Sequence, residues 1–230
     1  TGTVGLKMRH SRWPLDGIVP LSPTLDSTGI LTRTVEDLVF AFTAFRGVGV
    51  RDPGPIRRLD KSDASSLRIG IGDASMWEDC DDSIVGSVQQ MLREAEDAGM
   101  RIMDQSLPEA IEAVELLRQG SVVSTECDEF LQAELPEWRD TLDPFIAARI
   151  RDGGSISAGE YLSRQRRLAR IAESAAQRFD GCDVIVSPTV AISPPTVDEV
   201  ATLEGYRPRN LMSLRNTCVA NSLGLCAVSI

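Results

Sequence analysis

Six hydroxyl side chains fall in one short stretch, WPLDGIVPLSPTLDSTGILTRTVEDL, residues 13–38. A Ser or Thr hydroxyl becomes a nucleophile only beside a group that takes its proton. The base candidates are His10 in a polar loop, Lys61 in a Gly- and Pro-rich connection, and Lys7 at the end of a strand-like segment. No Gly/Ser-rich turn follows Lys7 to present a nucleophile to it. We therefore predict that the hydroxyls of residues 22–34 form turns and helix caps.

Metal chemistry has little support in the sequence. The acidic run DCDD, residues 79–82, would suit a hard cation, but acidic residues before a helix also complement its dipole, and we favour the second interpretation. The cysteines are scattered, with no pair at metal-ligand spacing: Cys80, Cys127, Cys182, Cys218 and Cys226. This pattern predicts reduced thiols, no metal site and a cytoplasmic protein. No glycine-rich nucleotide loop is present.

Charge and hydropathy limit the classes of partner. The chain has 230 residues, a net charge of −10 and 42% apolar residues. Nucleic acids and anionic membranes attract clustered positive charge, so we expect neither as a partner. We interpret the one arginine-rich run, residues 164–170, as the solvated face of a helix. No apolar run in the sequence has the length needed to cross a bilayer.

The elements that must position these residues alternate between strands and helices. Strand-like segments lie at 1–7, 67–72, 100–108, 182–190 and 225–230, and helical patterns lie at 34–47, 81–99, most of 109–150 and 157–179. Pro136 and Pro144 break the third helical region, and Ser157 is a candidate cap of the last one. The strand–helix–strand order around residues 67–108 favours a parallel pair. The predicted class is α/β, with a mixed, largely parallel central sheet covered by helices.

The first helix has both a start signal and an apolar face. Thr34, followed by Asp37 three residues later, resembles a capping box, and Gly47 is the predicted end. The residues expected to face inward are Leu38, Val39, Phe42 and Phe45.

Several segments, in this order, resemble the amidase-signature hydrolases. They are TGTVGLK with PLDGIVPLSPTLDSTGILTRTVEDL, then LRIGIG with DDSIVGSVQQMLREAEDAGMRI, then YLSRQRRLARIAESAAQRFDGCDVIVSPT, and finally NTCVANSLGLCAVSI. The resemblance covers essentially the whole chain, and residues 17–38 and 179–189 are its most specific parts. It implies a hydrolase of carbon–nitrogen bonds in amides that needs no cofactor.

The resemblance also implies which part of such an enzyme this is. The family uses a serine nucleophile, a bridging serine with a cis peptide, and a lysine base, all in segments upstream of TGTVGLK. We therefore expect no catalytic residue in this chain and assign no such role to Lys7. The chain begins and ends in strand-like runs, which favours a single domain, residues 1–230, that is the C-terminal portion of an amidase domain cut at both ends. Alone it is expected to be inactive and to supply scaffold and pocket wall.

Two segments are candidates for that pocket wall. The loop with Thr189 and Val190 follows a strand, and α/β sheets place ligands at the ends of strands. The helix with Thr125 and Glu126 is the second candidate. A tight turn and a polar helix face explain the same residues equally well, so both interpretations stay open.

The expected partners are a small amide substrate, the missing N-terminal part of the same fold and, as a further option, a second copy in a homodimer. Two other functions remain open. One is the glutaminase subunit of a glutamyl-tRNA amidotransferase, which releases ammonia from glutamine. The other is a non-catalytic α/β module that binds a partner through exposed sheet edges.

Overall fold

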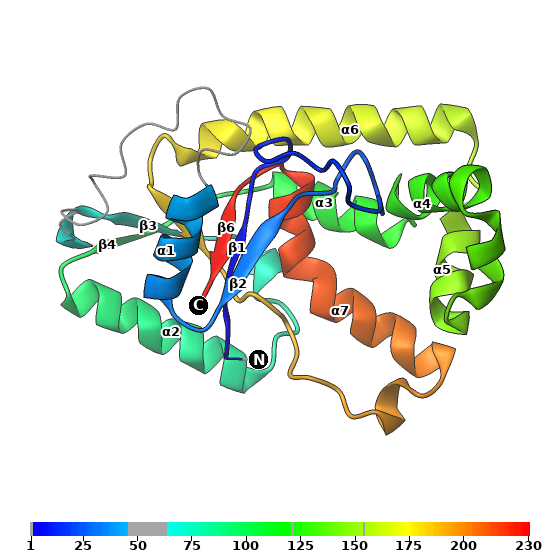
Figure 1. The fold of residues 1–230 in the computed structure, drawn as a ribbon. Helices are drawn as coiled ribbons and strands as arrows, with labels where there is room; N and C mark the ends of the chain where they lie inside the picture. Colours follow the sequence, from blue (N-terminus) through cyan, green and yellow to red (C-terminus); the bar gives the residue numbers. More distant parts are fainter. Residues whose placement is uncertain (1, 46–63, 121, 154) are drawn as a thin grey trace. The chain divides into compact units, whose positions relative to one another are not determined.

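A computed structural model describes residues 2–45, 64–120, 122–153 and 155–230 (Figure 1). The chain divides into two compact units. The first contains residues 1–54, 116–169 and 224–230, and the second contains residues 55–115 and 170–223. The described strands form one three-stranded sheet in each unit. With helices accompanying a parallel sheet, the predicted α/β class is confirmed.

The sheet of the first unit is antiparallel, with the order β2-β1-β6. Its strands are β1 (Val4–Lys7), β2 (Gly29–Thr32) and β6 (Ala227–Ser229), which lie side by side in Figure 1. The strands β1 and β6 were predicted. Strand β2 was not, because its four residues follow a hydroxyl-rich run that also suits a turn, and only pairing with β1 distinguishes the two.

Helix α1 (Val35–Phe45) begins as predicted. The backbone amide of Asp37 donates to Thr34 Oγ1 at 3.1 Å, which satisfies one of the free donors of the first turn. The aromatic rings of Phe42 and Phe45 each lie 6.2 Å from the ring of Trp13. Phe45 nevertheless stays 53% exposed, so its predicted inward position is only partly correct. The predicted end at Gly47 lies outside the described residues.

Three helical segments follow one another in the first unit: α4 (Val122–Glu134), η4 (Pro136–Thr141) and α5 (Pro144–Gly153). The predicted proline breaks are confirmed, because η4 and α5 each begin at a proline. An apolar cluster holds α4 and α5 together, formed by Cys127, Leu131 and Ile150 with Phe130, Leu135 and Leu142. The helices also approach closely at Gly153, where an added β-carbon would lie 2.3 Å from Ser124 Cβ.

The sheet of the second unit is parallel, with the order β4-β3-β5. It consists of β3 (Arg68–Ile71), β4 (Arg101–Asp104) and β5 (Val184–Val186), and α2 (Asp82–Asp97) is the crossover between β3 and β4. The predicted parallel pair is confirmed. Gly70 is required at the centre of β3, because a β-carbon there would lie 2.5 Å from Gln105 Cβ.

The remaining elements complete the two units. They are η2 (Ala64–Ser66), η3 (Ala74–Met76), α3 (Glu109–Arg118), α6 (Ala158–Ala176), η5 (Gln177–Phe179), η6 (Asp198–Val200) and α7 (Leu203–Ser222). The predicted cap of α6 is confirmed, since the Glu160 amide donates to Ser157 Oγ at 3.1 Å. The division between the units falls within α3 and α6. Among the helices in the described ranges, none combines the length and the apolar character that crossing a membrane requires.

Candidate functional site

The turn Leu21–Asp26 is the best-defined part of the hydroxyl-rich stretch. Asp26 closes it by accepting the backbone amides of Leu21 and Ser22 through Oδ2, at 2.8 and 3.0 Å. The amides of Leu25 and Asp26 donate to the Ser22 carbonyl. Ser22 itself is only 1% exposed. The chain turns here as predicted, but the Asp26 carboxylate and the Ser22 carbonyl close the turn. The hydroxyls of Ser22 and Thr24 donate to Glu126 instead, so the prediction that they form turns was wrong at these two positions.

The carboxylate of Glu126 on α4 connects this turn to the helices. Its Oε2 accepts Ser22 Oγ at 2.6 Å and the backbone amide of Thr24 at 3.1 Å. Its Oε1 accepts the hydroxyl of Thr24 and, at 2.6 Å, the hydroxyl of Tyr161 on α6. Four donors therefore converge on one half-buried carboxylate.

Gln165 completes this arrangement from the next turn of α6, since residues four apart share a helix face. Its amide nitrogen donates to Thr24 Oγ1 at 3.0 Å and to the hydroxyl of Tyr161 at 2.6 Å. We call Ser22, Thr24, Glu126, Tyr161 and Gln165 the Glu126 network. All its members belong to the first unit.

The hydrogen bonds decide the charge state of the network. Burial raises the pKa of the Glu126 carboxyl, but the hydrogen bonds from Ser22, Thr24 and Tyr161 outweigh burial and hold the pKa below its ordinary value. Burial, and next the hydrogen bond to Glu126, raise the pKa of the Tyr161 phenol. At neutral pH the carboxylate is therefore ionised and the phenol is protonated.

The sequence singled out Glu126 without its partners. Tyr161 and Gln165 carry a weak signal in the sequence, namely two polar side chains four residues apart on a long helix. Gln165 forms a hydrogen bond with Thr24, which lies 141 positions earlier in the chain. No local sequence pattern reveals a contact between residues so far apart. Thr125, the neighbouring candidate, is half-buried and donates to the Gly153 carbonyl at 2.9 Å, at the close approach of α4 and α5.

The arginine-rich run of α6 is not uniformly solvated, so the prediction of a solvated face was partly wrong. Arg164 is 7% exposed. It donates to the carbonyls of Gln119 and Gly120, beyond the end of α3, and to Glu160 at 2.7 Å. Arg164 can be buried because its stem is apolar and because its guanidinium has enough N–H donors to bind the free carbonyls at a helix end.

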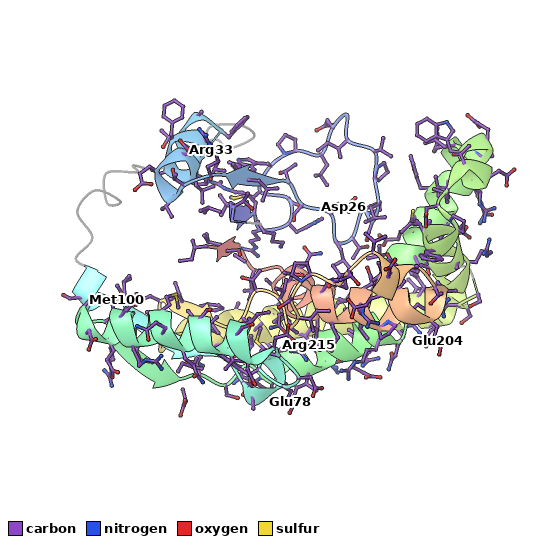
Figure 2. All side chains as sticks on the ribbon, turned by 90° about the horizontal axis from the view of Figure 1, so that it is seen from below. Asp26, Arg33, Glu78, Met100, Glu204 and Arg215 are labelled. Atoms are coloured by element: carbon purple, nitrogen blue, oxygen red, sulfur yellow. The ribbon has the colours of Figure 1, made fainter. Side chains whose placement is uncertain are left out.

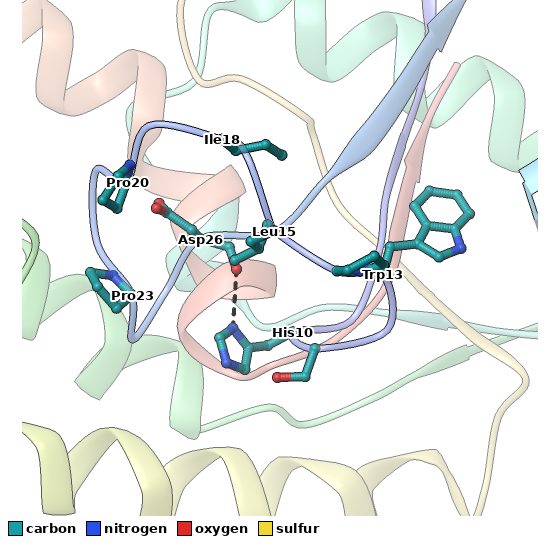
Figure 3. Close-up of a pocket in the computed structure, with 9 residues that line it drawn as sticks. His10, Trp13, Leu15, Ile18, Pro20, Pro23 and Asp26 are labelled. Atoms are coloured by element: carbon teal, nitrogen blue, oxygen red, sulfur yellow. Dashed lines mark hydrogen bonds between the residues drawn. The ribbon is translucent and has the colours of Figure 1, made fainter. Parts of the chain in front are cut away.

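An open cavity of about 390 Å³ lies against the same turn in the first unit (Figure 3). Its walls are mostly apolar side chains, including Leu15, Ile18, Pro20 and Pro23. His10 and Asp26 are among its polar groups, and His10 Nδ1 donates to the Asp26 carbonyl at 3.0 Å. Figure 3 shows the Trp13 indole pointing away from Asp26 and Pro20, which fits its packing against α1.

Lys7 has a structural partner inside the first unit. Its Nζ donates at 2.9 Å to the carbonyl of Leu225, which precedes β6. Burial lowers the pKa of this ammonium. The contact is consistent with the expectation that Lys7 does not activate a nucleophile, since it already holds a backbone carbonyl.

The second candidate loop belongs to the second unit. Thr189 is exposed and Val190 is half-buried, directly after β5 and Pro188. The segment is fixed on both sides, because the Pro188 carbonyl accepts Asn216 Nδ2 at 2.7 Å and the Ser193 amide donates to Asp81 Oδ2 at 2.7 Å. The hydrogen bond from Ser193 lowers the pKa of Asp81. Of the DCDD run, Asp81 therefore positions a loop, and Asp82 lies in the first turn of α2.

Arg215 and Asn216 on α7 were missed by the sequence reasoning. They are 3% and 5% exposed (Arg215 is labelled in Figure 2). Arg215 Nη1 donates to the Glu78 carbonyl at 2.7 Å, and Asn216 Nδ2 donates to the Met76 carbonyl at 2.8 Å. These contacts fix the segment after β3, and the contact with Pro188 fixes the segment after β5. No periodic signal predicts a buried arginine that binds carbonyl groups.

The candidate residues therefore fall into two separate sets. Thr125 and Glu126 lie in the first unit with the Glu126 network, and Thr189 and Val190 lie in the second unit. Near each set, one polar side chain binds backbone groups: Glu126 accepts the amide of Thr24, and Asn216 donates to the carbonyl of Pro188.

Comparison with known proteins gives these sets a context. The chain is 38% identical, over 232 residues, to the 2-amino-5-chloromuconic acid deaminase of Comamonas testosteroni, matching 100% of this chain and 49% of that protein. It is 28% identical to a glutamyl-tRNA(Gln) amidotransferase subunit of Nitratidesulfovibrio vulgaris, matching 85% of this chain and 46% of that protein. The chain thus spans about half the length of these curated relatives.

The fold agrees with the sequence comparison. A crystal structure of an amidase superposes on 100% of this chain and 50% of its own with a TM-score of 0.78, at 19% identity. The model of the Amidase family matches residues 1–230. The predicted resemblance is confirmed, and the chain belongs to the Amidase family, the amidase-signature hydrolases.

Proposed function

We propose that the complete protein hydrolyses the carbon–nitrogen bond of a small amide. The observation that carries this proposal is the match of the Amidase family model along the whole chain. The 38% identity to a deaminase supports it further, since that protein's name also describes the removal of nitrogen. The protein is proposed to act in the cytoplasm, which its five free cysteines support.

In the proposed mechanism, a serine attacks the amide carbonyl, a bridging serine with a cis peptide relays its proton, and a lysine is the final base. The carbon–nitrogen bond then breaks, the amine leaves with the relayed proton, and water hydrolyses the acyl-enzyme. All three groups are proposed to lie upstream of these residues, as in the family. The engagement of Lys7 with the Leu225 carbonyl supports this placement.

The residues described above are proposed to form scaffold and substrate pocket. Thr125 and Glu126 would contribute one part of the pocket wall, and Thr189 and Val190 another. The support is local: the half-buried Glu126 carboxylate fixes the backbone of the neighbouring turn at Thr24, and the buried Asn216 amide fixes the backbone at Pro188, next to Thr189.

A second candidate substrate class follows from the 38% identity to the deaminase, which is named for a small amino-substituted diacid. A third is glutamine, which the similarity to an amidotransferase suggests. A non-catalytic α/β module remains the alternative of a different kind.

One assay separates these candidates. Ammonia release by the complete protein would be measured with small aliphatic and aromatic amides, with 2-aminomuconic-type acids, and with glutamine in the presence and absence of tRNA and the other amidotransferase components. We expect turnover of a small amide without tRNA. Turnover of the amino-diacid alone, or of glutamine only with the other components, would replace the first candidate. Binding without any turnover would favour the module.

Two controls belong to this assay. Residues 1–230 by themselves are expected to release no ammonia from the same substrates, because the proposed nucleophile and base are not among them. Thr189→Val in the complete protein is expected to change the relative kcat/KM of the amides. An unchanged preference would remove Thr189 from the pocket, and activity of residues 1–230 alone would contradict the proposed division of roles.

A further inference from the structure

The Glu126 network has a definite direction. A carboxylate only accepts hydrogen bonds and an amide NH₂ group only donates them. Thr24 and Tyr161 each contact both Glu126 Oε1 and Gln165 Nε2. Each hydroxyl must therefore donate its one hydrogen to Glu126 and accept from Gln165. The four groups close a ring in which every hydrogen bond points from Gln165 towards Glu126.

The second carboxylate oxygen anchors the backbone. Glu126 Oε2 accepts the Thr24 amide and the hydroxyl of Ser22, which is buried inside the turn Leu21–Asp26. The same turn lines the cavity of Figure 3, where Pro23 and Asp26 form part of the wall. The position of this wall depends on the network, because Ser22 and Thr24 are tied to α4 through the one carboxylate of Glu126.

We propose that the cavity of Figure 3 is part of the substrate site and that Glu126 and Gln165 are its positioning residues: they fix the hydroxyls of Thr24 and Tyr161 in one direction and hold the turn Leu21–Asp26 that lines the cavity. The assignment rests on the proposed amide hydrolysis. It also changes the role proposed for Glu126. The carboxylate already accepts four hydrogen bonds, so its oxygens are occupied. The substrate would therefore contact the turn Leu21–Asp26 rather than the carboxylate.

Exchanging the two side chains tests the direction of the ring. In Gln165→Glu two carboxylates face the two hydroxyls, neither hydroxyl oxygen has a donor, and the charges repel. In the double variant Glu126→Gln/Gln165→Glu the new amide keeps its oxygen on Ser22 and the Thr24 amide. Its NH₂ group then donates to both hydroxyls, which donate onwards to the new carboxylate. Every hydrogen bond of the ring is restored in the reverse direction, and the network again carries one charge.

The experiment uses the complete protein and measures unfolding by denaturant. Gln165→Glu is expected to lower the denaturant concentration at the midpoint of unfolding. Adding Glu126→Gln is expected to recover most of that lost stability, so the effects of the two substitutions should be strongly non-additive. Glu126→Ala/Gln165→Glu relieves the repulsion but supplies no donor, so it should recover less. Glu129→Gln, on the exposed face of α4, removes the same charge outside the network and should rescue nothing. Equal rescue by the Ala and Gln double variants would overturn the proposal.

A spectroscopic measurement covers the case in which a variant fails to fold. The ultraviolet titration of Tyr161 is isolated as the difference between each protein and the same protein with Tyr161→Phe. Glu126→Gln, which removes the negative charge, is expected to shift the phenol titration to lower pH, while Glu129→Gln leaves it in place. An unshifted titration in Glu126→Gln would contradict the contact on which the proposal stands.

The kinetic measurement links the network to the site. Gln165→Glu is expected to raise KM for the amide substrate by roughly tenfold, which corresponds to one hydrogen bond to a charged group, with a smaller change in kcat. The double exchange should bring KM back. Unchanged KM in a folded Gln165→Glu protein would overturn the positioning role. If the unmodified protein hydrolyses no amide, the proposed function fails, while unfolding and titration still decide whether the network has the assigned direction.

Discussion

At the scale of single residues, several polar side chains in the described part of this protein bind backbone groups. Thr34 caps α1, Asp26 closes a turn, and Asn216 holds two carbonyls. Buried backbone groups need such partners, because an unpaired group costs about as much as a lost hydrogen bond. Within residues 13–38, Thr34 acts in this way, whereas the hydroxyls of Ser22 and Thr24 donate to the Glu126 carboxylate.

Thr34→Ala should lower the free energy of unfolding by about 1 kcal/mol, because the Asp37 amide loses its acceptor at the start of α1. Denaturant unfolding of the two proteins measures this difference. Thr34→Ser keeps an oxygen in the same place and should cost only a fraction of that. A Ser variant as unstable as the Ala variant would show that the methyl group, not the cap, carries the effect.

The contribution of Glu126 to stability should depend on pH. Its pKa in the folded protein lies below its ordinary value, so the unfolded chain binds a proton first as the pH falls. The contribution is therefore complete above the unfolded pKa of roughly 4.3 and is lost as the pH drops through the lower folded value.

The stability difference between the unmodified protein and Glu126→Gln, followed from pH 7 to pH 3, measures this contribution. It should shrink as the pH drops through that acidic window. A constant Glu126→Gln difference over the whole range would contradict the assigned ionisation.

At the scale of elements, small residues decide how closely the helices and strands approach. Gly70 lets Gln105 pack against β3 in the second unit. Gly153 lets α5 approach the backbone of α4 in the first, where Thr125 donates to its carbonyl. Core packing has the density of a crystal, so an added methyl group at such a contact forces the neighbours to move.

Gly153→Ala is expected to destabilise the protein by roughly 1–3 kcal/mol, because the new β-carbon would lie 2.3 Å from Ser124 Cβ. Gly86→Ala is the matched control, since this glycine lies within α2 with no atom within 4 Å of an added β-carbon. That substitution should stabilise by about 0.5–1 kcal/mol through helix propensity. Thermal or denaturant unfolding compares the two, and a Gly153→Ala protein as stable as Gly86→Ala would refute the close contact.

At the scale of the whole molecule, both outer strands of the antiparallel sheet, β2 and β6, have one edge without a partner strand among the described residues. They also present apolar side chains, with Leu31 79% and Val228 57% exposed. Unpaired edges with apolar faces promote association of chains. A curated relative is about twice as long as this chain. We propose that, in a protein of that length, the additional polypeptide covers these edges and apolar side chains.

Residues 1–230 by themselves are therefore expected to self-associate with rising concentration, as measured by sedimentation velocity. Val228→Lys should reduce the association by placing a charge on β6. Thr217→Lys, at an exposed site on α7, adds the same charge away from the sheet and should leave association unchanged. Monomeric behaviour of the unmodified chain at high concentration would argue against a role for these edges.

The local order of this protein follows largely from its sequence. Caps at Thr34 and Ser157, breaks at Pro136 and Pro144, and the parallel β3–β4 pair were all predicted, because each depends on residues close together in the chain. The family followed as well, since its motifs extend along the whole chain.

Tertiary structure alone decided the rest. Strand β2 needed its partner β1, the burial of Arg164 needed the carbonyls beyond α3, and Glu126 acquired its four donors from segments about 100 and 35 residues away. Composition and periodicity report which side chains could form hydrogen bonds. Which donor meets which acceptor depends on chain segments far apart in sequence, and so the direction of the Glu126 network is visible only in the folded protein.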